Sequence, residues 1–128
     1  MKNLALITAI IVMLFSLSAC GGSTVKLEET TNGQTVALKV GQKLTISLEG
    51  NPTTGYSWDV SEIDQAVIEQ VGEAEFKSDS NLIGSGGLVT LTFNGVAPGE
   101  TRIKLVYHKA WEEDVPPLEE FEIFVKVN

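Results

Sequence analysis

The feature that most constrains the fold of this chain is the regular alternation of apolar and polar residues in several short segments. Leu44, Ile46 and Leu48 alternate with charged or hydroxyl-bearing residues over positions 43–49, as in a strand that buries one face. The same period of two residues recurs over residues 36–40, 56–60, 88–96, 102–107 and 121–127. Residues 62–68 are less regular and could form a short helical turn, but no segment keeps an apolar period of 3.6 residues.

These segments predict an all-β domain with a single core. About seven to eight short strands in roughly a hundred residues favour an immunoglobulin-like antiparallel β-sandwich, with a small β-barrel as the alternative. Cys20 is the only cysteine, so the disulfide of antibody domains cannot form and stability must come from burial. Trp58 is therefore expected in the core without a sulfur partner.

The N-terminal segment resembles an export signal. Lys2 precedes an apolar stretch, residues 4–15, that has the length of a signal-peptide core and is short for a membrane span. The segment ends in Leu17-Ser18-Ala19-Cys20, which resembles the lipobox of bacterial lipoproteins, in which the cysteine accepts a diacylglycerol. An ordinary signal peptide that contains a cysteine is the alternative.

This resemblance divides the chain into three predicted parts. Residues 1–19 are the signal peptide, residues 20–32 are the lipidated cysteine and a flexible tether, and residues 33–128 are the folded domain. The expected location is the cell envelope, outside the cytoplasm, with the domain anchored to a membrane through the lipid on Cys20.

The charge of the chain argues against some classes of partner. Its formal net charge is −8, and removal of Lys2 with the signal would make the remainder more acidic. Such a domain is a poor ligand for nucleic acid or anionic lipid headgroups, so membrane attachment should depend on acyl chains. The sequence shows no metal-ligand spacing, and we expect a monomer without a metal or cofactor.

Three segments between the predicted strands have the composition of binding loops, and the first is Asn51-Pro52-Thr53-Thr54-Gly55-Tyr56. Pro52 fixes its own φ and biases Asn51 toward an extended conformation, while Gly55 can adopt a positive φ. The two threonines would then be presented on a partly rigid backbone, which lowers the entropy lost on docking. An ordinary strand connection is the alternative interpretation.

The other two segments are Gly84-Ser85-Gly86-Gly87 and Lys109-Ala110-Trp111. Glycines let a main chain lie along a groove and exchange backbone hydrogen bonds, although a flexible hairpin connection has the same composition. An exposed indole at Trp111 would be an interface anchor, whereas a buried one would be a core residue beneath a long loop.

Together and in this order, the segments resemble the three binding loops of the chagasin-like inhibitors of papain-type cysteine peptidases. The first matches the family's NPTTGY/F pattern at every position, Trp58 also suits the family, and the second matches its GxGG element. The resemblance extends over residues 33–128. It implies a reversible competitive inhibitor and not an enzyme, with loops that enter the cleft of a papain-like cysteine peptidase and place Thr53 and Thr54 nearest its catalytic cysteine and histidine.

The third segment departs from the Arg-Pro-Trp (or Phe) pattern of that family. Lys109 keeps the positive charge but lacks the planar fork with which arginine binds a carboxylate through two hydrogen bonds. Ala110 removes the stiffness of proline, and Trp111 is retained. The departure leaves the range of targets and the tightness of binding open. Residues 112–117 are expected to be a solvated stretch that returns the chain to the last strand.

Three other classes of function are alternatives. An enzyme would use His108, the only histidine, but no nucleophile elbow accompanies it. A calcium site would use Glu112, Glu113 and Asp114, whose pattern is more typical of a solvated face than of a calcium loop. An immunoglobulin-like surface lipoprotein that binds an envelope or host component shares the predicted fold, so the fold cannot separate it from an inhibitor.

Overall fold

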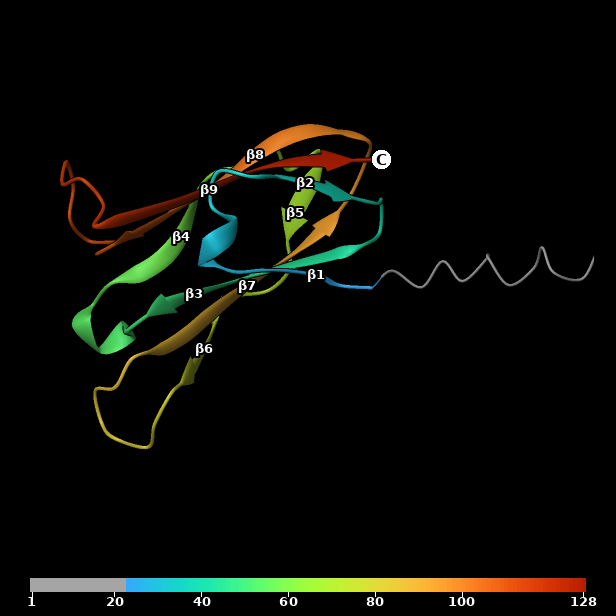
Figure 1. Ribbon diagram of the computed structural model, residues 1–128. Coiled ribbons are helices and arrows are strands. Elements are labelled where there is room, and N and C mark those ends of the chain that lie inside the picture. The colour runs from blue at the N-terminus through green and yellow to red at the C-terminus, as the bar shows by residue number, and fades with distance from the viewer. Residues whose placement is uncertain (1–22) are drawn as a thin grey trace, which may run out of the picture.

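The computed structural model describes residues 23–128, which form two β-sheets packed face to face (Figure 1). The strands are β1 Val25–Leu27, β2 Thr35–Leu38, β3 Lys43–Gly50, β4 Ser57–Glu62, β5 Ile68–Gln70, β6 Glu75–Ser78, β7 Gly87–Gly95, β8 Gly99–His108 and β9 Glu119–Val127. Two 3₁₀ turns accompany them, η3 Glu29–Thr31 and η4 Pro52–Thr54. The all-β sandwich is confirmed, with more strands than the predicted seven to eight because β1, β5 and β6 are too short to show an alternating pattern.

The two sheets are mixed rather than purely antiparallel. The first has the order β1-β3-β7-β5, with β6 also paired to β7, and the second has the order β2-β9-β8-β4. The long strands pair antiparallel, as predicted, but the edge pairs β1–β3 and β2–β9 are parallel. The chain leaves the first sheet after β1, runs through the second sheet as β2, and returns as β3. It reverses direction twice on this path, so β3 runs parallel to β1.

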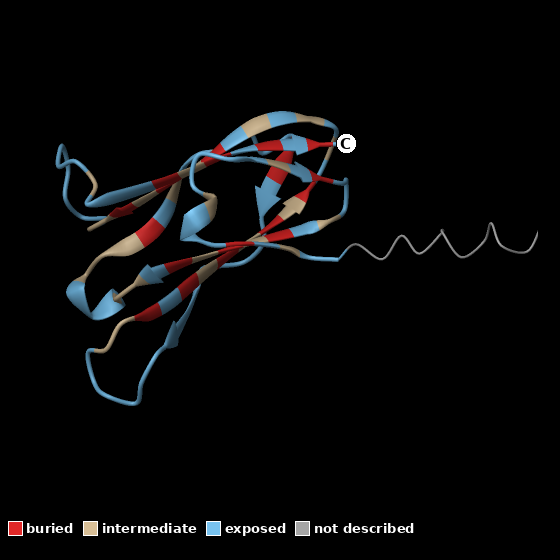
Figure 2. Cartoon of the chain, in the orientation of Figure 1, coloured by how far each residue is buried: buried red, intermediate tan, exposed pale blue. Residues whose placement is uncertain are grey.

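The core lies between the inner faces of the sheets, and the alternation in sequence decides which residues fill it. Figure 2 shows buried segments along the facing strands and exposed connections at their ends. Trp58 is buried, as predicted, and its indole Nε1 donates a hydrogen bond to the Glu49 carbonyl oxygen at 3.0 Å. The residues with no measurable exposure are Leu44, Ile46, Ile68, Phe93, Ile103, Leu105 and Ile123.

The predicted tether is too long at its C-terminal end. Val25–Leu27 forms β1, which pairs with β3, and Leu27 is buried in the core. Glu29–Thr31 continues as η3. Residues 25–32 therefore belong to the folded domain, because even a three-residue strand gains an edge pairing and one buried leucine. The signal peptide and Cys20 lie outside the described residues.

The irregular segment at residues 62–68 contains one hydrogen-bonded turn and no helix. The Asp64 carbonyl oxygen accepts hydrogen bonds from the amides of Val67 and Ile68, after which β5 begins. Within residues 23–128, no helix is long and apolar enough to span a membrane.

All three predicted loops lie at the same end of the sandwich, at the left in Figure 1. The last strand pairs at this end are Gly50↔Gly87, Ser57↔His108 and Tyr107↔Glu119. The beginning of β1 and the C-terminus lie at the opposite end (Figure 1). Strand register thus gathers segments that are more than twenty residues apart in sequence.

Candidate functional site

The first loop, residues 51–56, crosses from the first sheet to the second, because β3 and β4 belong to different sheets. Its centre is the 3₁₀ turn η4, which begins with Pro52. Asn51 before it is extended, with φ −143°, and Gly55 after it is left-handed, with φ 87°. The conformation agrees with the restraints expected of proline and glycine at these positions.

Asn51 connects this loop to its surroundings. Its side-chain Oδ1 accepts hydrogen bonds from the Thr53 amide at 3.1 Å and the Thr53 hydroxyl at 2.6 Å, and its carbonyl oxygen accepts one from the Thr54 hydroxyl at 2.6 Å. Its amide donates to the Tyr107 hydroxyl at 2.9 Å, and its Nδ2 donates to the Gly84 carbonyl oxygen at 2.9 Å. A single residue thereby ties the first loop to itself, to β8 and to the second loop.

The second loop connects β6 to β7 and is held chiefly at its base. The hydroxyls of Ser78 and Ser85 are 2.8 Å apart, and the Asp79 amide donates to the Gly86 carbonyl oxygen at 3.0 Å. A Cβ atom at Gly87 would lie 2.0 Å from the Lys77 carbonyl oxygen, so only glycine allows the strands to approach this closely. The glycine run therefore has a structural role at its end in addition to any role in binding.

The tip of the second loop carries two apolar residues that the sequence analysis missed. Leu82 is 77% exposed and Ile83 is fully exposed. They directly precede Gly84, whose φ is 81°. The sequence signal for them is a pair of adjacent apolar residues outside any alternating pattern. Adjacent residues of a strand point to opposite sides, so such a pair cannot both face the core and can contact a partner instead.

The third loop connects β8 to β9 and places its indole on the surface. Trp111 is 68% exposed, so it is not a core residue. One part of its ring nevertheless lies against the first loop, because a Cβ atom at Gly55 would be 2.5 Å from the Trp111 Cη2 atom. The absence of a side chain at Gly55 makes room for this contact.

Lys109 in the third loop faces inward. Its Nζ atom lies 5.1 Å from the centre of the Tyr56 ring and 3.8 Å from Glu112 Oε1. Tyr56 stacks on Tyr107 with ring centres 5.2 Å apart, and Tyr107 packs on Trp58 at 5.0 Å. A column of three aromatic rings therefore runs from the loops into the core.

The histidine of the enzyme hypothesis lacks the contact that nucleophilic catalysis requires. His108 Nε2 lies 2.8 Å from Asp59 Oδ2, and the Ser57 hydroxyl donates to the same oxygen at 2.9 Å. The acid thus lies between the serine and the histidine, whereas activation of a hydroxyl needs the histidine next to it. This arrangement supplies no activated nucleophile.

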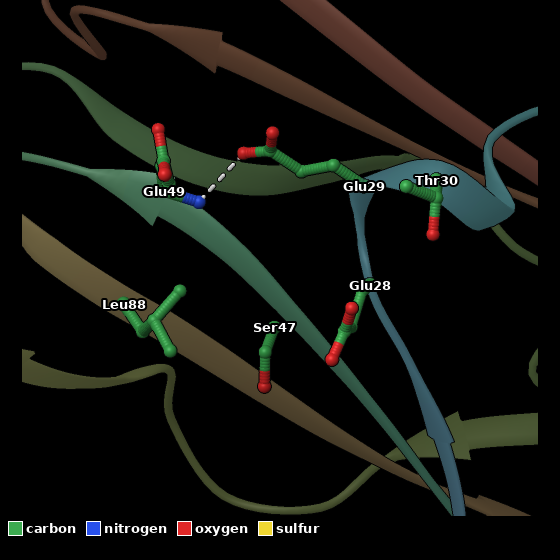
Figure 3. A pocket seen from close by; sticks show the side chains of 6 residues that line it. All are labelled: Glu28, Glu29, Thr30, Ser47, Glu49 and Leu88. Atoms are coloured by element: carbon green, nitrogen blue, oxygen red, sulfur yellow. Dashed lines mark hydrogen bonds between the residues drawn. The ribbon is translucent and has the colours of Figure 1, made fainter.

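Acidic residues are clustered elsewhere, but not in the manner of a metal site. In the part of the chain that the structure describes, no three His, Cys, Asp or Glu residues are arranged to hold a metal ion. A pocket of about 320 Å³ lies on the first sheet, and Glu29 Oε1 accepts a hydrogen bond there from the Glu49 amide at 2.8 Å. Figure 3 shows its lining side chains. Its lining residues are Glu28, Glu29, Thr30, Ser47, Glu49 and Leu88, none of which belongs to the three loops.

Known proteins are similar to this chain in sequence and in fold. Residues 37–125 match the chagasin family peptidase inhibitor I42. Chagasin of Trypanosoma cruzi is 30% identical over 107 residues, which cover 80% of this chain and 97% of chagasin.

Two solved structures are similar in fold. The crystal structure of EhICP2, a cysteine protease inhibitor from Entamoeba histolytica, has a TM-score of 0.71 at 23% identity and covers 82% of this chain and 95% of its own. The structure of PbICP-C in complex with falcipain-2 has a TM-score of 0.52 at 22% identity, with coverage of 84% and 100%.

Proposed function

This chain belongs to the chagasin family of peptidase inhibitors, and we propose that it inhibits papain-like cysteine peptidases by inserting its three loops into the active-site cleft. The observation that carries the proposal is the meeting of the three motifs on one surface. The second loop is tied to the first through Asn51 and Gly84, and the third through Trp111 and Gly55. The protein is accordingly an inhibitor and not an enzyme.

The first loop has the properties of a rigid wedge. The hydroxyls of Thr53 and Thr54 are bonded within the loop, and both side chains lie on the exposed surface. Since these groups are already ordered, docking costs little conformational entropy. A tight 3₁₀ turn also differs from the extended main chain that pairs with a groove, so the loop can block a cleft without presenting a bond in the geometry for cleavage.

The second and third loops would extend the contact on either side of the wedge. Gly84 and Gly86 allow close approach of the main chain, with Ile83 exposed beside them, and Trp111 offers a large indole surface. An immunoglobulin-like surface module of other function is not favoured, because the family match and the relatives point to peptidase inhibition.

Titration of papain with residues 21–128 tests the proposal. We expect reversible, competitive inhibition, and binding should persist when the catalytic cysteine of papain carries a small blocking group. Absence of inhibition at micromolar protein would contradict the proposed function. Cleavage within residues 51–56 at the rate of inhibition would instead identify the chain as a substrate.

We also propose that the protein is an exported lipoprotein held in the cell envelope by a lipid on Cys20. The beginning of β1 lies at the end of the sandwich opposite the loops (Figure 1), so an anchor preceding it would leave the loops facing away from the membrane. Metabolic labelling with a fatty acid should mark the wild-type protein and not Cys20→Ser. A wild-type protein without an acyl group would contradict this proposal.

A further inference from the structure

We infer that Lys109 is a positioning residue that clasps the third loop to the first, rather than a charge that the inhibitor offers to its target. The inference rests on the proposed function for its effect on binding. It concerns the position at which this chain departs from the Arg-Pro-Trp (or Phe) pattern, with Lys109 and Ala110 before Trp111.

The charge of Lys109 is engaged twice within its own molecule. The ammonium lies over the Tyr56 ring and close to Glu112 Oε1, and about two thirds of the side chain is covered. The Glu112 amide also donates to the Lys109 carbonyl oxygen at 3.0 Å, which closes a turn around the pair. The ring face and the carboxylate both attract the ammonium, so together they hold it within its own molecule.

The space between Lys109 and its two partners is filled within the molecule, and about a third of the Lys109 side chain faces solvent on the other side. Tyr56, Lys109 and Glu112 line a cleft of about 20 Å³ together with His108, Val115 and Pro116. This volume is about that of a single water molecule. A carboxylate of a bound peptidase does not fit between the ammonium and its partners, so it would have to approach Lys109 from the exposed side, in competition with Glu112.

The clasp determines the position of the indole. Lys109 contacts Tyr56 while Trp111 contacts Gly55, so two neighbouring contacts join the third loop to the end of the first. Tyr56 in turn stacks on Tyr107, whose hydroxyl accepts a hydrogen bond from the Asn51 amide. A proline at position 110 would stiffen the backbone of the third loop, and Ala110 does not. Here the contacts of Lys109 with Tyr56 and of Trp111 with Gly55 restrain the loop instead.

This arrangement also specifies the chemistry of the partner. The third loop presents an apolar indole followed by the exposed acidic residues 112–114, and its one cation is engaged within the molecule, so the peptidase needs an apolar surface opposite Trp111 and no acidic residue opposite Lys109.

Substitutions at Lys109 and Glu112 distinguish the clasp from a direct contact by the sign of their effects. If the clasp exists, Lys109→Met and Glu112→Gln should each weaken binding to papain by about 3- to 10-fold, mainly through faster dissociation. Lys109→Arg, which keeps the cation, should retain most of the wild-type affinity. The double variant should be no weaker than Lys109→Met alone. With a direct contact to the target, Glu112→Gln would free the ammonium and tighten binding, which would overturn the inference.

Glu113→Gln is the matched control, because it changes the net charge equally while Glu113 forms no ion pair within residues 23–128. It should leave the affinity nearly unchanged. Equal weakening by Glu113→Gln and Glu112→Gln would show a general charge effect and would also overturn the clasp.

A measurement on the free protein separates this inference from the proposed function. The ε-methylene protons of Lys109 should resonate upfield of those of the exposed Lys43 because of the Tyr56 ring, and Glu112→Gln should reduce the difference. An ordinary shift for Lys109 would overturn the clasp even if papain is inhibited. An upfield shift in a protein that fails to inhibit papain would support the clasp and reject the proposed function.

Discussion

The first and second loops lie side by side at one end of the sandwich but are held in different ways. The first is bonded at its centre, where Asn51 joins its own turn, β8 and the second loop. The second is bonded at its base, through Ser78 and Ser85, while Leu82 and Ile83 at its tip are exposed. The first loop is thus bonded to several elements where it projects, whereas the second projects with two exposed apolar side chains.

Topology explains the difference. A loop that crosses between two sheets passes close to both and can be anchored on either side, as the first loop is to Gly84 and to Tyr107. A hairpin within one sheet, such as residues 79–86, rests mainly on its own strands and is tied to the first loop at the Gly84 carbonyl oxygen. In an inhibitor, this arrangement combines a stiff part that blocks a cleft with a part that can adapt to the surface beside it.

The most severe test of the rigid loop is Thr54→Arg, which should abolish inhibition of papain. A bulky charged side chain at the end of this rigid turn would prevent the first loop from entering the peptidase cleft. Thr54 is exposed, and the substitution removes the two hydrogen bonds of its hydroxyl, to the Asn51 carbonyl oxygen and from the Tyr56 amide, so the free energy of unfolding should fall by only about 1–2 kcal/mol. Thr54→Ser, which keeps the hydroxyl, is the control for inhibition assays and thermal melting. Undiminished inhibition by Thr54→Arg would exclude this loop from the cleft.

The substitutions Gly55→Ala and Gly84→Ala compare the stability of the two loops directly in the free protein. Both glycines have nearly the same positive φ, 87° and 81°, which costs an alanine about 1–2 kcal/mol. Only the Gly55 position has a neighbour within 4 Å, the indole of Trp111. Gly55→Ala should therefore lower the free energy of unfolding by about 3 kcal/mol and alter Trp111 fluorescence, whereas Gly84→Ala should show the backbone cost alone. Equal losses would mean that the third loop does not rest on the first.

Trp111→Ala separates binding from stability at the third loop. Loss of an exposed anchor should weaken binding by about 2 kcal/mol and lower the free energy of unfolding by only about 1 kcal/mol, through the lost contact with Gly55. A buried tryptophan would instead cost about 3–5 kcal/mol of folding stability. Affinity by titration and melting by calorimetry on the one variant distinguish these outcomes.

The smallest effect is expected at the adaptable tip. Ile83→Ser should not change the free energy of unfolding, because the side chain is fully exposed, but it should weaken binding by about 1 kcal/mol if the peptidase buries part of it. Val40→Ser, an exposed apolar position at the far end of the sandwich, should affect neither quantity by more than about 0.5 kcal/mol. An affinity unchanged by Ile83→Ser would leave the rigid loop and Trp111 as the main apolar contacts.

Sequence patterns predicted the long strands well and the short ones poorly. The alternation that includes Ile46 and Leu91 identifies an inner face, because successive side chains of a strand point to opposite sides. No such pattern exists in Val25–Leu27 or in Glu75–Ser78, which are strands only because β3 and β7 offer them an edge. For that reason the sequence pattern places Val25–Leu27 in the tether and indicates no strand at Glu75–Ser78.

By itself, the sequence determined which residues face the core and how the first loop bends, because alternation, Pro52 and Gly55 act through local backbone geometry. Only the tertiary structure decided which residues of different loops meet. Asn51 reaches Gly84, and Trp111 rests on Gly55, because strand register and the order of strands in two sheets bring them together. Such contacts depend on distances across the fold that no local pattern records, so a motif can identify the loops without revealing what holds them in place.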